Sequence, residues 1–596
     1  MSEPAVEREP GLALRDVPRA TPQEITRSSE YPLRVVNLTV CLPDGEQVLQ
    51  DVSFPVGRQQ LIVVLGPSGS GKTTLLEAIA GLRRVAGGVV EYKGSSLHAD
   101  RAMLCRLAGL VPQDAGAGVH PQLTARAALD RGADLRLGRG AGRRERRQRV
   151  AAILARLGID RRARTRVGRL SGGERSRVGM GLALITEPAL LLLDEPTANL
   201  DPGNVLSVMR LLAGLAHAGT GRMVIVTTHS ESSLRLADRL LVLTPGGRMA
   251  YFGPPRRGLS YFGKDSWAQV CEAFVGQPGR DWAGEFRASS YYTDCVAAPM
   301  ATGCKPVSVL PSQPPPRLPG RLSQARTLIR RHLALIATDR AYLAFAVGVP
   351  AFFAAVLRMI PAPQGLTGPH AANTAIQPLL LLLTFASALA GSLPVIDEIA
   401  AERTIYARER TAGLSATAYL ASKLLILAPI AALQATAMTT AAVWGRALPP
   451  HGVVLTSPLL ELDTATAALA VVSCALGLLL STAIHSDRAR FLILMAVISG
   501  QLILTGAVVT ITTIPGLRQA SWLFPARWGF AATASTLHFT TIMQPTAGVT
   551  PDPLWAPHPH IWETDMLMLG VLGAIITLLT WILLITLGPG RGRTAR

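Results

Sequence analysis

Charged residues are scarce in this chain, and the scarcity is uneven. They make up 17% of the 596 residues, whereas apolar residues make up 49%. Six stretches nearly lack charge, and each is long enough to cross ~30 Å of hydrocarbon as a helix rising ~1.5 Å per residue. These stretches are 341–360, 376–396, 418–445, 464–484, 491–513 and 566–587. The sequence therefore predicts six membrane-spanning helices.

Cysteine is also scarce. The chain has Cys41, Cys105, Cys271, Cys295, Cys304 and Cys474. They show no metal-ligand spacing, and none lies in a loop expected on the outer side of the membrane. We expect no disulfide and no cysteine-bound metal.

The first 30 residues lack the apolar run of a secretory signal peptide. We expect a disordered tail that stays in the cytoplasm. Six crossings then return the C-terminus to that side, and arginine and lysine are concentrated in the segments that this topology makes cytoplasmic. The expected location is the cell membrane, with both termini in the cytoplasm.

Acidic residues do not balance the basic ones, and the formal net charge is +19. Much of the excess lies in residues 136–169 and beside the predicted membrane helices. A solvated helical face explains the first group, and contact with anionic lipid headgroups explains the second. We therefore expect membrane lipids as partners and no nucleic acid.

A glycine-rich segment carries the clearest chemical pattern. It lies between an apolar run, Leu61–Leu65, that indicates a buried strand and a helical run. The segment reads Gly66-Pro67-Ser68-Gly69-Ser70-Gly71-Lys72-Thr73, and Thr74 follows it. Its glycines let backbone N–H groups turn toward phosphate oxygens, and the helix N-terminus adds its positive dipole end. The spacing predicts a phosphate-binding loop in which Lys72 reaches the β- and γ-phosphates and Thr73 holds Mg²⁺.

Four polar residues follow strand-like runs further along the chain: Gln113, Asp194, Glu195 and His229. In a phosphoryl-transfer site, Asp194 and Gln113 would contact Mg²⁺, and Glu195 would polarise the hydrolytic water. His229 would hold the γ-phosphate. Other interpretations exist, because a histidine after a strand is usually structural and paired carboxylates can cap a helix. The phosphate loop upstream favours the catalytic interpretation.

A signature segment opens a predicted helix between Gln113 and Asp194. It reads Leu170-Ser171-Gly172-Gly173-Glu174-Arg175. With the phosphate loop and the four polar residues, it resembles the ATP-binding-cassette transporters over residues 31–255. The resemblance implies an α/β P-loop NTPase fold in which the signature from Ser171 to Glu174 contacts ATP held by a facing domain. One loop and one signature then imply a partner, either a second copy or a related half-transporter.

The sequence departs from that family at one point. Its members often stack adenine on an aromatic residue upstream of the phosphate loop, but residues 32–53 contain no Phe, Tyr or Trp. Cys41, Leu42 or Val48 would have to pack the base by apolar contact.

Domain order narrows the resemblance to the G (White) subfamily. The ATPase domain precedes the membrane domain, and residues 246–254 resemble the end of that subfamily's nucleotide domain. Residues 256–320 end in a proline-rich stretch and are expected to run extended as a linker. Residues 321–340 mix apolar side chains with arginines and are similar to the subfamily's connecting helix at the membrane surface.

The loop after the second predicted crossing adds to this resemblance. Glu398–Arg410, followed by Tyr419 and Lys423, is similar to the subfamily's coupling helix, which transmits ATPase closure to the membrane helices. A solvated loop that obeys the positive-inside rule would have a similar composition.

These features predict an α/β P-loop ATPase domain followed by an all-α six-helix transmembrane domain at residues 341–596. The expected function is ATP- and Mg²⁺-dependent export of a hydrophobic or amphipathic substrate, such as a lipid, glycolipid or drug-like molecule, by a homodimer. The resemblance to the G subfamily implies that the second and fifth crossings line its cavity, where they would offer Phe385, Gln501 and Thr505. Two alternatives stay open: a dedicated polysaccharide or glycolipid exporter, and a membrane-tethered regulatory ATPase without transport.

Overall fold

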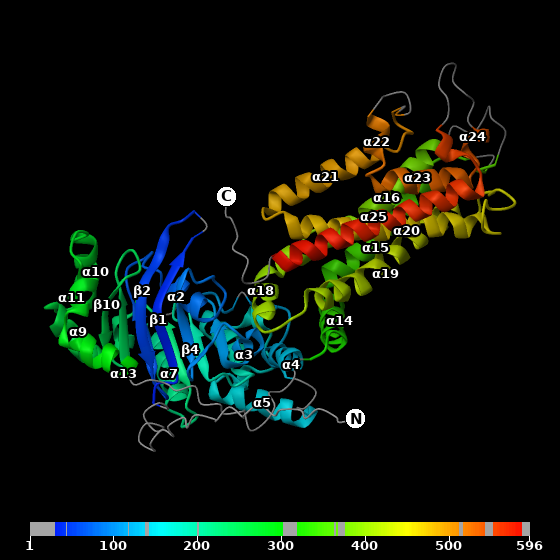
Figure 1. The fold of residues 1–596 in the computed structure, drawn as a ribbon. Helices are drawn as coiled ribbons and strands as arrows, with labels where there is room; N and C mark the ends of the chain where they lie inside the picture. Colours follow the sequence, from blue (N-terminus) through cyan, green and yellow to red (C-terminus); the bar gives the residue numbers. More distant parts are fainter. Residues whose placement is uncertain are drawn as a thin grey trace, which may run out of the picture.

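The computed structural model describes residues 30–301 and 319–586, except for 43, 117, 138–141, 199–201, 363–364, 368–375, 510, 512–515 and 543–551. An α/β domain and a bundle of long helices lie at opposite ends of an elongated molecule (Figure 1). Helices α14 (Arg321–Thr338) and α18 (Arg403–Thr411) lie between the two. The predicted order, an α/β domain followed by an all-α domain, is confirmed.

A six-stranded sheet organises the first domain. In spatial order it contains β10 (Met249–Gly253), β9 (Arg239–Leu243), β3 (Leu61–Leu65), β8 (Met223–Thr227), β7 (Leu190–Leu193) and β6 (Ala108–Val111). All neighbours are parallel except β10, which pairs antiparallel with β9. The carboxyl ends of β3, β6, β7 and β8 therefore meet at one edge, where ligands bind in open α/β sheets.

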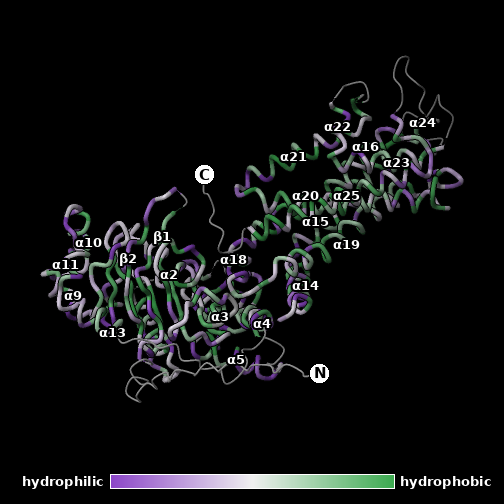
Figure 2. The backbone as a smooth tube through the Cα atoms, in the orientation of Figure 1, coloured by the Kyte–Doolittle hydropathy of each residue, from purple (hydrophilic) through white to green (hydrophobic). Residues whose placement is uncertain are grey.

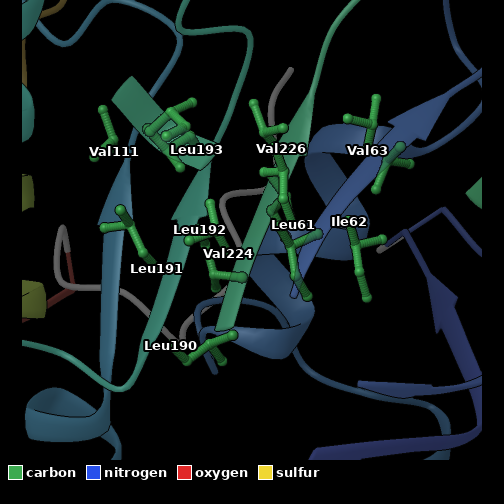
Figure 3. Packing of buried hydrophobic residues seen from close by; sticks show 14 of the residues in the cluster. Leu61, Ile62, Val63, Val111, Leu190, Leu191, Leu192, Leu193, Val224 and Val226 are labelled. Atoms are coloured by element: carbon green, nitrogen blue, oxygen red, sulfur yellow. The ribbon is translucent and has the colours of Figure 1, made fainter. Parts of the chain in front are cut away.

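The central strands are almost purely aliphatic, and every residue of β3, β7 and β8 is buried. Continuous apolar runs are typical of parallel strands that are covered by helices on both faces. Figure 3 shows the side chains of Leu61, Leu191 and Val224 in this core. The sheet forms a rigid platform for the loops that follow its strands.

A smaller antiparallel sheet packs beside the first. Its order is β2 (Gln47–Val56), β1 (Leu33–Cys41), β4 (Gly87–Tyr92) and β5 (Ser95–Ser96). Strands β1 and β2 form an antiparallel hairpin, and Gly45 in its turn has a φ of +90°. The helices are α2 (Lys72–Ile79), α3 (Arg101–Leu107), α4 (Ala125–Arg136), α5 (Arg143–Arg156), α6 (Gly172–Leu184), α7 (Pro202–Ala216) and α8 (Glu231–Leu234).

The segment after β10 corrects the predicted linker. It folds into α9 (Pro255–Phe262), α10 (Trp267–Gly276), α11 (Trp282–Arg287), α12 (Ser290–Tyr292) and α13 (Ala298–Ala301). The ring of Tyr251 lies 5.4, 6.0 and 5.8 Å from those of Tyr261, Phe262 and Phe286. The extended linker is therefore wrong up to residue 301, because spaced aromatic side chains extend the core of the domain. Residues 302–318 lie outside the described residues.

The helical domain begins after α14. It contains α15 (Arg340–Met359), α16 (Ile376–Ser392), α17 (Glu398–Ala401), α18, α19 (Ala416–Val443), α20 (Pro458–Ala483), α21 (Asp487–Ile503), α22 (Leu517–Ser521), α23 (Pro525–Thr536), α24 (Phe539–Ile542) and α25 (Pro559–Thr586). Helices α20 and α25 begin earlier than predicted, each with a proline in its first turn, a position that proline fits well.

Five helical segments among the described residues are long and apolar enough to cross a membrane, where the sequence predicted six. The exception is the predicted crossing at 491–513, because α21 has 17 residues and ends at Ile503. The hydroxyl of Thr505 donates to the carbonyl of Leu502 at 2.8 Å, and Gly506 has a φ of +91°. This polar turn ends the helix at ~26 Å, short of the ~30 Å of a hydrocarbon core.

The surface of the long helices is apolar (Figure 2). Val347, Leu433 and Leu492 are 71%, 70% and 66% exposed. Apolar surface on this scale needs a non-aqueous cover, and backbone that is hydrogen-bonded within helices satisfies the requirements of lipid. The helical domain is therefore that of a membrane protein.

Candidate functional site

The phosphate loop joins the end of β3 to the start of α2, as predicted. Gly69 and Gly71 have φ values of +79° and +85°, and a Cβ on Gly71 would lie 2.9 Å from the carbonyl oxygen of Val48. Nothing would lie within 4 Å of a Cβ on Gly69, so the loop has open space beside it. The buried hydroxyl of Ser70 has no hydrogen-bond partner among the described residues. This backbone and its orphaned hydroxyl fit a phosphate group.

Lys72 lies over this loop. Its Nζ donates to the carbonyl oxygens of Gly66 and Pro67, both at 2.9 Å. Burial lowers the pKa of Lys72, and the carboxylate of Glu195 opposes that shift. An arriving phosphate would favour the charged ammonium and exchange its carbonyl partners for phosphate oxygens.

Three predicted catalytic residues converge on one carboxylate. Gln113 follows β6, Glu195 follows β7 and His229 follows β8. The amide of Gln113 donates to one oxygen of Glu195 at 3.0 Å, and Nε2 of His229 lies 2.7 Å from the other. The structure therefore brings together side chains that are separated by up to 116 positions in the sequence (229 minus 113).

Asp194 and Thr227 hold this carboxylate in place. The hydroxyl of Thr227 donates to the buried carboxylate of Asp194 at 2.9 Å and accepts from the backbone N–H of Glu195 at 2.7 Å. Glu195 has a φ of +42°, a strained conformation for a residue other than glycine. Asp194 and the exposed hydroxyl of Thr73 are oxygen ligands of the kind that Mg²⁺ prefers. No local pattern in the sequence indicated the role of Thr227.

The signature segment begins α6. Ser171 is the N-cap, its hydroxyl accepts from the N–H of Glu174 at 3.2 Å, and the carboxylate of Glu174 accepts from the N–H of Ser171 at 3.0 Å. Glu174 is therefore engaged in a capping box. Ser171 and Gly172 are exposed, so the N-terminal end of the helix is open to an anion from outside the chain.

The predicted base-packing residues lie on the β1–β2 hairpin. The carbonyl of Val48 would lie only 1.7 Å from a Cβ on Gly247, so the strand passes close to the loop before β10 as well as to Gly71. Cys41 pairs with Gln47 at the hairpin end. Of the predicted residues, Val48 lies against the phosphate loop.

A second polar cluster lies at the junction of the two domains, around the predicted coupling helix. Glu402 accepts from the hydroxyl of Tyr419 at 2.7 Å and lies 2.8 Å from Nζ of Lys423. Lys423 also lies 2.5 Å from Glu398, which lies 3.2 Å from Nδ1 of His332. Because Lys423 bridges the carboxylates of Glu398 and Glu402, its ammonium group neutralises them in place of a metal ion.

The ATPase domain reaches into this cluster. Nε2 of His120, in the loop after Gln113, lies 3.7 Å from Glu402. Burial lowers the pKa of His120 to about 4, and Arg331 adds to the shift. Leu135 of α4 is buried in a hydrophobic cluster with Leu328 of α14. The sequence predicted neither contact, because one histidine and one leucine carry no local pattern.

Glu409 completes the junction. It pairs with Arg331 of α14, and both side chains are buried. A Cβ on Gly118 of the ATPase domain would lie 2.8 Å from Nη1 of Arg408, so the Arg408 side chain packs directly against the backbone of Gly118. The predicted coupling segment is thus in direct contact with the loop that starts at the nucleotide site.

Comparison with known proteins agrees with this architecture. Residues 49–198 match the family described as ABC transporter, and residues 323–538 match the ABC-2 type transporter family. The chain is 35% identical over 565 residues to the ABC transporter ATP-binding/permease protein Rv1747 of Mycobacterium tuberculosis, covering 92% of this chain and 62% of that protein.

Two further relatives match the first domain. Identity is 38% over 224 residues to ABC transporter G family member 21 of Arabidopsis thaliana, covering 36% of this chain and 32% of the plant protein. It is 34% over 239 residues to the taurine import ATP-binding protein TauB of Yersinia pestis, covering 39% of this chain and 87% of TauB. The chain thus spans 62% of the mycobacterial relative and 32% of the plant relative. With both parts matched in this order, the chain belongs to the ATP-binding-cassette transporter family, with an ATP-binding domain ahead of an ABC-2 type membrane domain.

Proposed function

We propose that this chain is one half of a homodimeric transporter, which hydrolyses ATP and exports a hydrophobic or amphipathic substrate across the cytoplasmic membrane. One loop carries the proposal. Gln113 at its start donates to Glu195, and His120 further along lies 3.7 Å from Glu402 of the membrane domain. A change at the nucleotide therefore has a short path to the membrane helices. The ATPase domain and both termini are cytoplasmic.

Hydrolysis rests on Glu195. Its carboxylate orients and polarises the water that attacks the γ-phosphate, while Lys72 holds the β- and γ-phosphates. Gln113 and His229 bind the carboxylate in this structure, and they turn to the nucleotide when ATP occupies the site. Thr73, Gln113 and Asp194 would hold Mg²⁺, which would supply positive charge to neutralise the phosphate oxygens.

A second copy of the chain completes the site. The start of α6 offers the backbone N–H groups of Gly172 and Gly173, which the capping box between Ser171 and Glu174 leaves unpaired, and the positive end of the helix dipole. These groups contact the γ-phosphate bound by the facing copy. Glu174 acts through the helix cap, since its carboxylate bonds to the N-cap backbone.

The junction moves as one unit and transmits closure of the ATPase domains to the membrane helices. Lys423 of α19 and Arg331 of α14 pair with Glu402 and Glu409 on either end of α18. Buried ion pairs separate only at a large cost, since each would leave an uncompensated charge. Movement of the loop that carries His120 therefore moves α18, α14 and the base of α19 together.

The substrate class follows from the helices that are expected to line the cavity. Gln501 is buried and accepts from the N–H of Ala526 at 3.2 Å, and Thr505 bonds within its own turn. These side chains, predicted to be offered to the cavity, are used inside the fold. The exposed side chains of α21 include Phe491, Leu492 and Ile503. An apolar surface of this kind suits a lipid, glycolipid or hydrophobic drug.

The first test is ATPase activity in lipid nanodiscs, followed by transport into inside-out vesicles. Wild type should hydrolyse ATP, a lipid or hydrophobic compound should stimulate the rate, and ATP should drive that compound into the vesicles. Glu195→Gln should neither hydrolyse ATP nor transport the compound, whereas the exposed control Glu145→Gln on α5 should match wild type. ATP hydrolysis without movement of any compound in the panel would favour a regulatory ATPase and overturn the transport proposal.

A further inference from the structure

A groove of about 500 Å³ runs along the half of α19 that is distal to the ATPase domain. Six of its lining residues come from α19 and the residue after it, and one comes from the end of α15. They are Leu433, Thr436, Ala437, Thr440, Ala441, Trp444 and Arg358. The groove lies outside the helices assigned to the substrate path.

The length of the groove matches one leaflet of a membrane. Leu433 and Trp444 are eleven positions apart (444 minus 433), which is ~16 Å along a helix, against ~15 Å for half of a hydrocarbon core. Leu433 and Trp444 are 70% and 73% exposed. Between them Ala437 and Ala441 leave a shallow apolar floor. These dimensions suit one acyl chain.

Positive charge gathers at the distal end of this groove. Nη1 of Arg358 donates to the carbonyl of Trp444, and Nη2 of Arg446 donates to the carbonyls of Leu357, Arg358 and Ile360 at 2.9, 3.2 and 2.8 Å. Burial, and then the neighbouring Arg358, lower the pKa of Arg446. The two guanidinium groups therefore lie close together.

Neither guanidinium has a carboxylate partner among the described residues. No carboxylate lies within 4.0 Å of Arg358 or Arg446 in the part of the chain that the structure describes, and residues 359–396 and 447–460 contain no Asp or Glu. Asp463, the acid nearest to the lining, accepts from the hydroxyl of Thr440 at 3.1 Å, one turn deeper than Trp444. Two cations at the end of an apolar groove call for an anion with a hydrocarbon tail.

We propose that this groove binds an anionic phospholipid, with an acyl chain along Leu433–Ala441 and its phosphate at Arg358 and Arg446. Its assignment to the outer leaflet rests on the proposed function, which makes the ATPase domain cytoplasmic. The bound headgroup supplies the missing negative charge between the distal ends of α15 and α19 and holds these helices together.

Trp444 gives a local measurement of this binding. The full chain is reconstituted in phosphatidylcholine vesicles. A rising fraction of either brominated phosphatidylglycerol or brominated phosphatidylcholine is then added. Brominated acyl chains quench tryptophan fluorescence on contact. The signal of a Trp444→Phe variant is subtracted. Brominated phosphatidylglycerol should quench Trp444 at a lower mole fraction than brominated phosphatidylcholine.

Two variants and one matched control identify the site. Arg358→Gln should reduce the preference for phosphatidylglycerol about fivefold, which corresponds to ~1 kcal/mol for one arginine near a membrane surface. Arg518→Gln, an exposed arginine of α22 with no ion-pair partner among the described residues, should leave the preference unchanged. Ala441→Leu keeps both arginines, fills the groove and should weaken quenching by both lipids.

The same measurements can overturn the proposal. Equal quenching by the two lipids in wild type would remove the anion site. If millimolar inorganic phosphate abolished the preference for phosphatidylglycerol and Ala441→Leu left quenching unchanged, the two arginines would form a site for free phosphate rather than for a lipid. No quenching by either lipid would place protein, such as a second copy, over the groove. The preference for phosphatidylglycerol should persist in Glu195→Gln, because lipid binding does not need ATP hydrolysis. A failure of the lipid proposal can therefore be told apart from a failure of the transport proposal.

Discussion

The nucleotide site and the domain junction both gather side chains around glutamates, but they bury those glutamates differently. At the nucleotide site, Glu195 contacts the exposed amide of Gln113 and the 54%-exposed side chain of His229. At the junction, Glu402 and its cation Lys423 are 9% and 3% exposed. Exposed partners can be exchanged for a ligand at little cost, whereas buried ion pairs cannot be separated cheaply.

This difference matches what each region has to do. A catalytic carboxylate must release its resting partners when ATP and water arrive. A mechanical junction must keep its shape while force passes through it. His120 lies in the loop that runs from the nucleotide site to the junction, and it contacts Glu402 of the junction. A rearrangement at the nucleotide site would therefore reach the junction through His120.

The strongest way to test the comparison is to remove the carboxylate of Glu195, the proposed catalytic group. Glu195→Gln should lower ATP turnover by about 10²–10⁴-fold, the range for loss of a positioned base, because an amide cannot accept the proton of water. Thermal stability should change little, since the ion-pair partner of Glu195, His229, is largely exposed. Turnover in nanodiscs and the unfolding midpoint would be measured together. A large loss of stability would show that Glu195 is structural.

Breaking the junction should have the opposite profile. Lys423→Met removes the cation shared by Glu398 and Glu402, and loss of one partner of a buried pair typically costs ~3–5 kcal/mol. We expect a lower unfolding midpoint and ATP turnover that substrate no longer stimulates.

The matched control for Lys423→Met is Glu145→Gln, which removes the exposed partner of the ion pair with Arg149 on α5. Exposed pairs contribute ~0.2–1 kcal/mol, so this variant should be close to wild type. Equal stability of the two variants would contradict the assignment of a rigid, buried junction.

Acid should loosen the junction. Burial lowers the pKa of His120 to about 4, with help from Arg331, and burial and Lys423 lower that of His332 to about 4. Between pH 6.5 and pH 4 the unfolded chain therefore binds more protons than the folded chain, and stability falls as pH decreases. Each pH unit in that window removes about 1.4 kcal/mol per histidine.

The measurement is the unfolding midpoint at pH 7.5, 6.5 and 5.5. His120→Gln/His332→Gln should flatten the slope between pH 6.5 and pH 5.5. Glu402 and Glu409 do not interfere, because the pKa of each lies below its ordinary value despite burial, held there by Lys423 and Arg331 respectively. Their stabilisation is lost only as pH falls below about 4.5. A slope that survives in the double variant would place the acid sensitivity elsewhere.

The sequence predicted the nucleotide site far better than the junction, and the reason is physical. Residues such as Lys72 and Asp194 lie at strand ends, where short apolar runs and glycines fix local geometry. The contact of His120 with Glu402 depends on how two domains meet, which no local spacing encodes. The helical segment from α9 to α13 was missed for a related reason: its rings pack on Tyr251 of β10, a tertiary contact.

Membrane helices showed the same limit at their ends. Apolar length predicted six crossings; five helical segments of spanning length are present among the described residues, but α21 ends at Ile503, inside an apolar run. There the turn at Thr505 and Gly506 outweighs hydropathy, because backbone conformation and a side-chain hydrogen bond decide where a helix stops.

The smallest expected effect probes the tolerance of the nucleotide site. Val48→Tyr replaces the aliphatic side chain that lies against the phosphate loop with an aromatic ring, and aromatic stacking contributes ~0.5–1.5 kcal/mol. ATP affinity should rise about two- to tenfold. Gln47→Tyr is the control, because successive side chains on a strand point to opposite faces. An open nucleotide site should accept a new aromatic partner without loss of ATP turnover. Higher ATP affinity in Val48→Tyr, with no change in Gln47→Tyr, would therefore support the contrast between the open nucleotide site and the buried junction. Equal gains from both would mean that the base does not pack on this hairpin face.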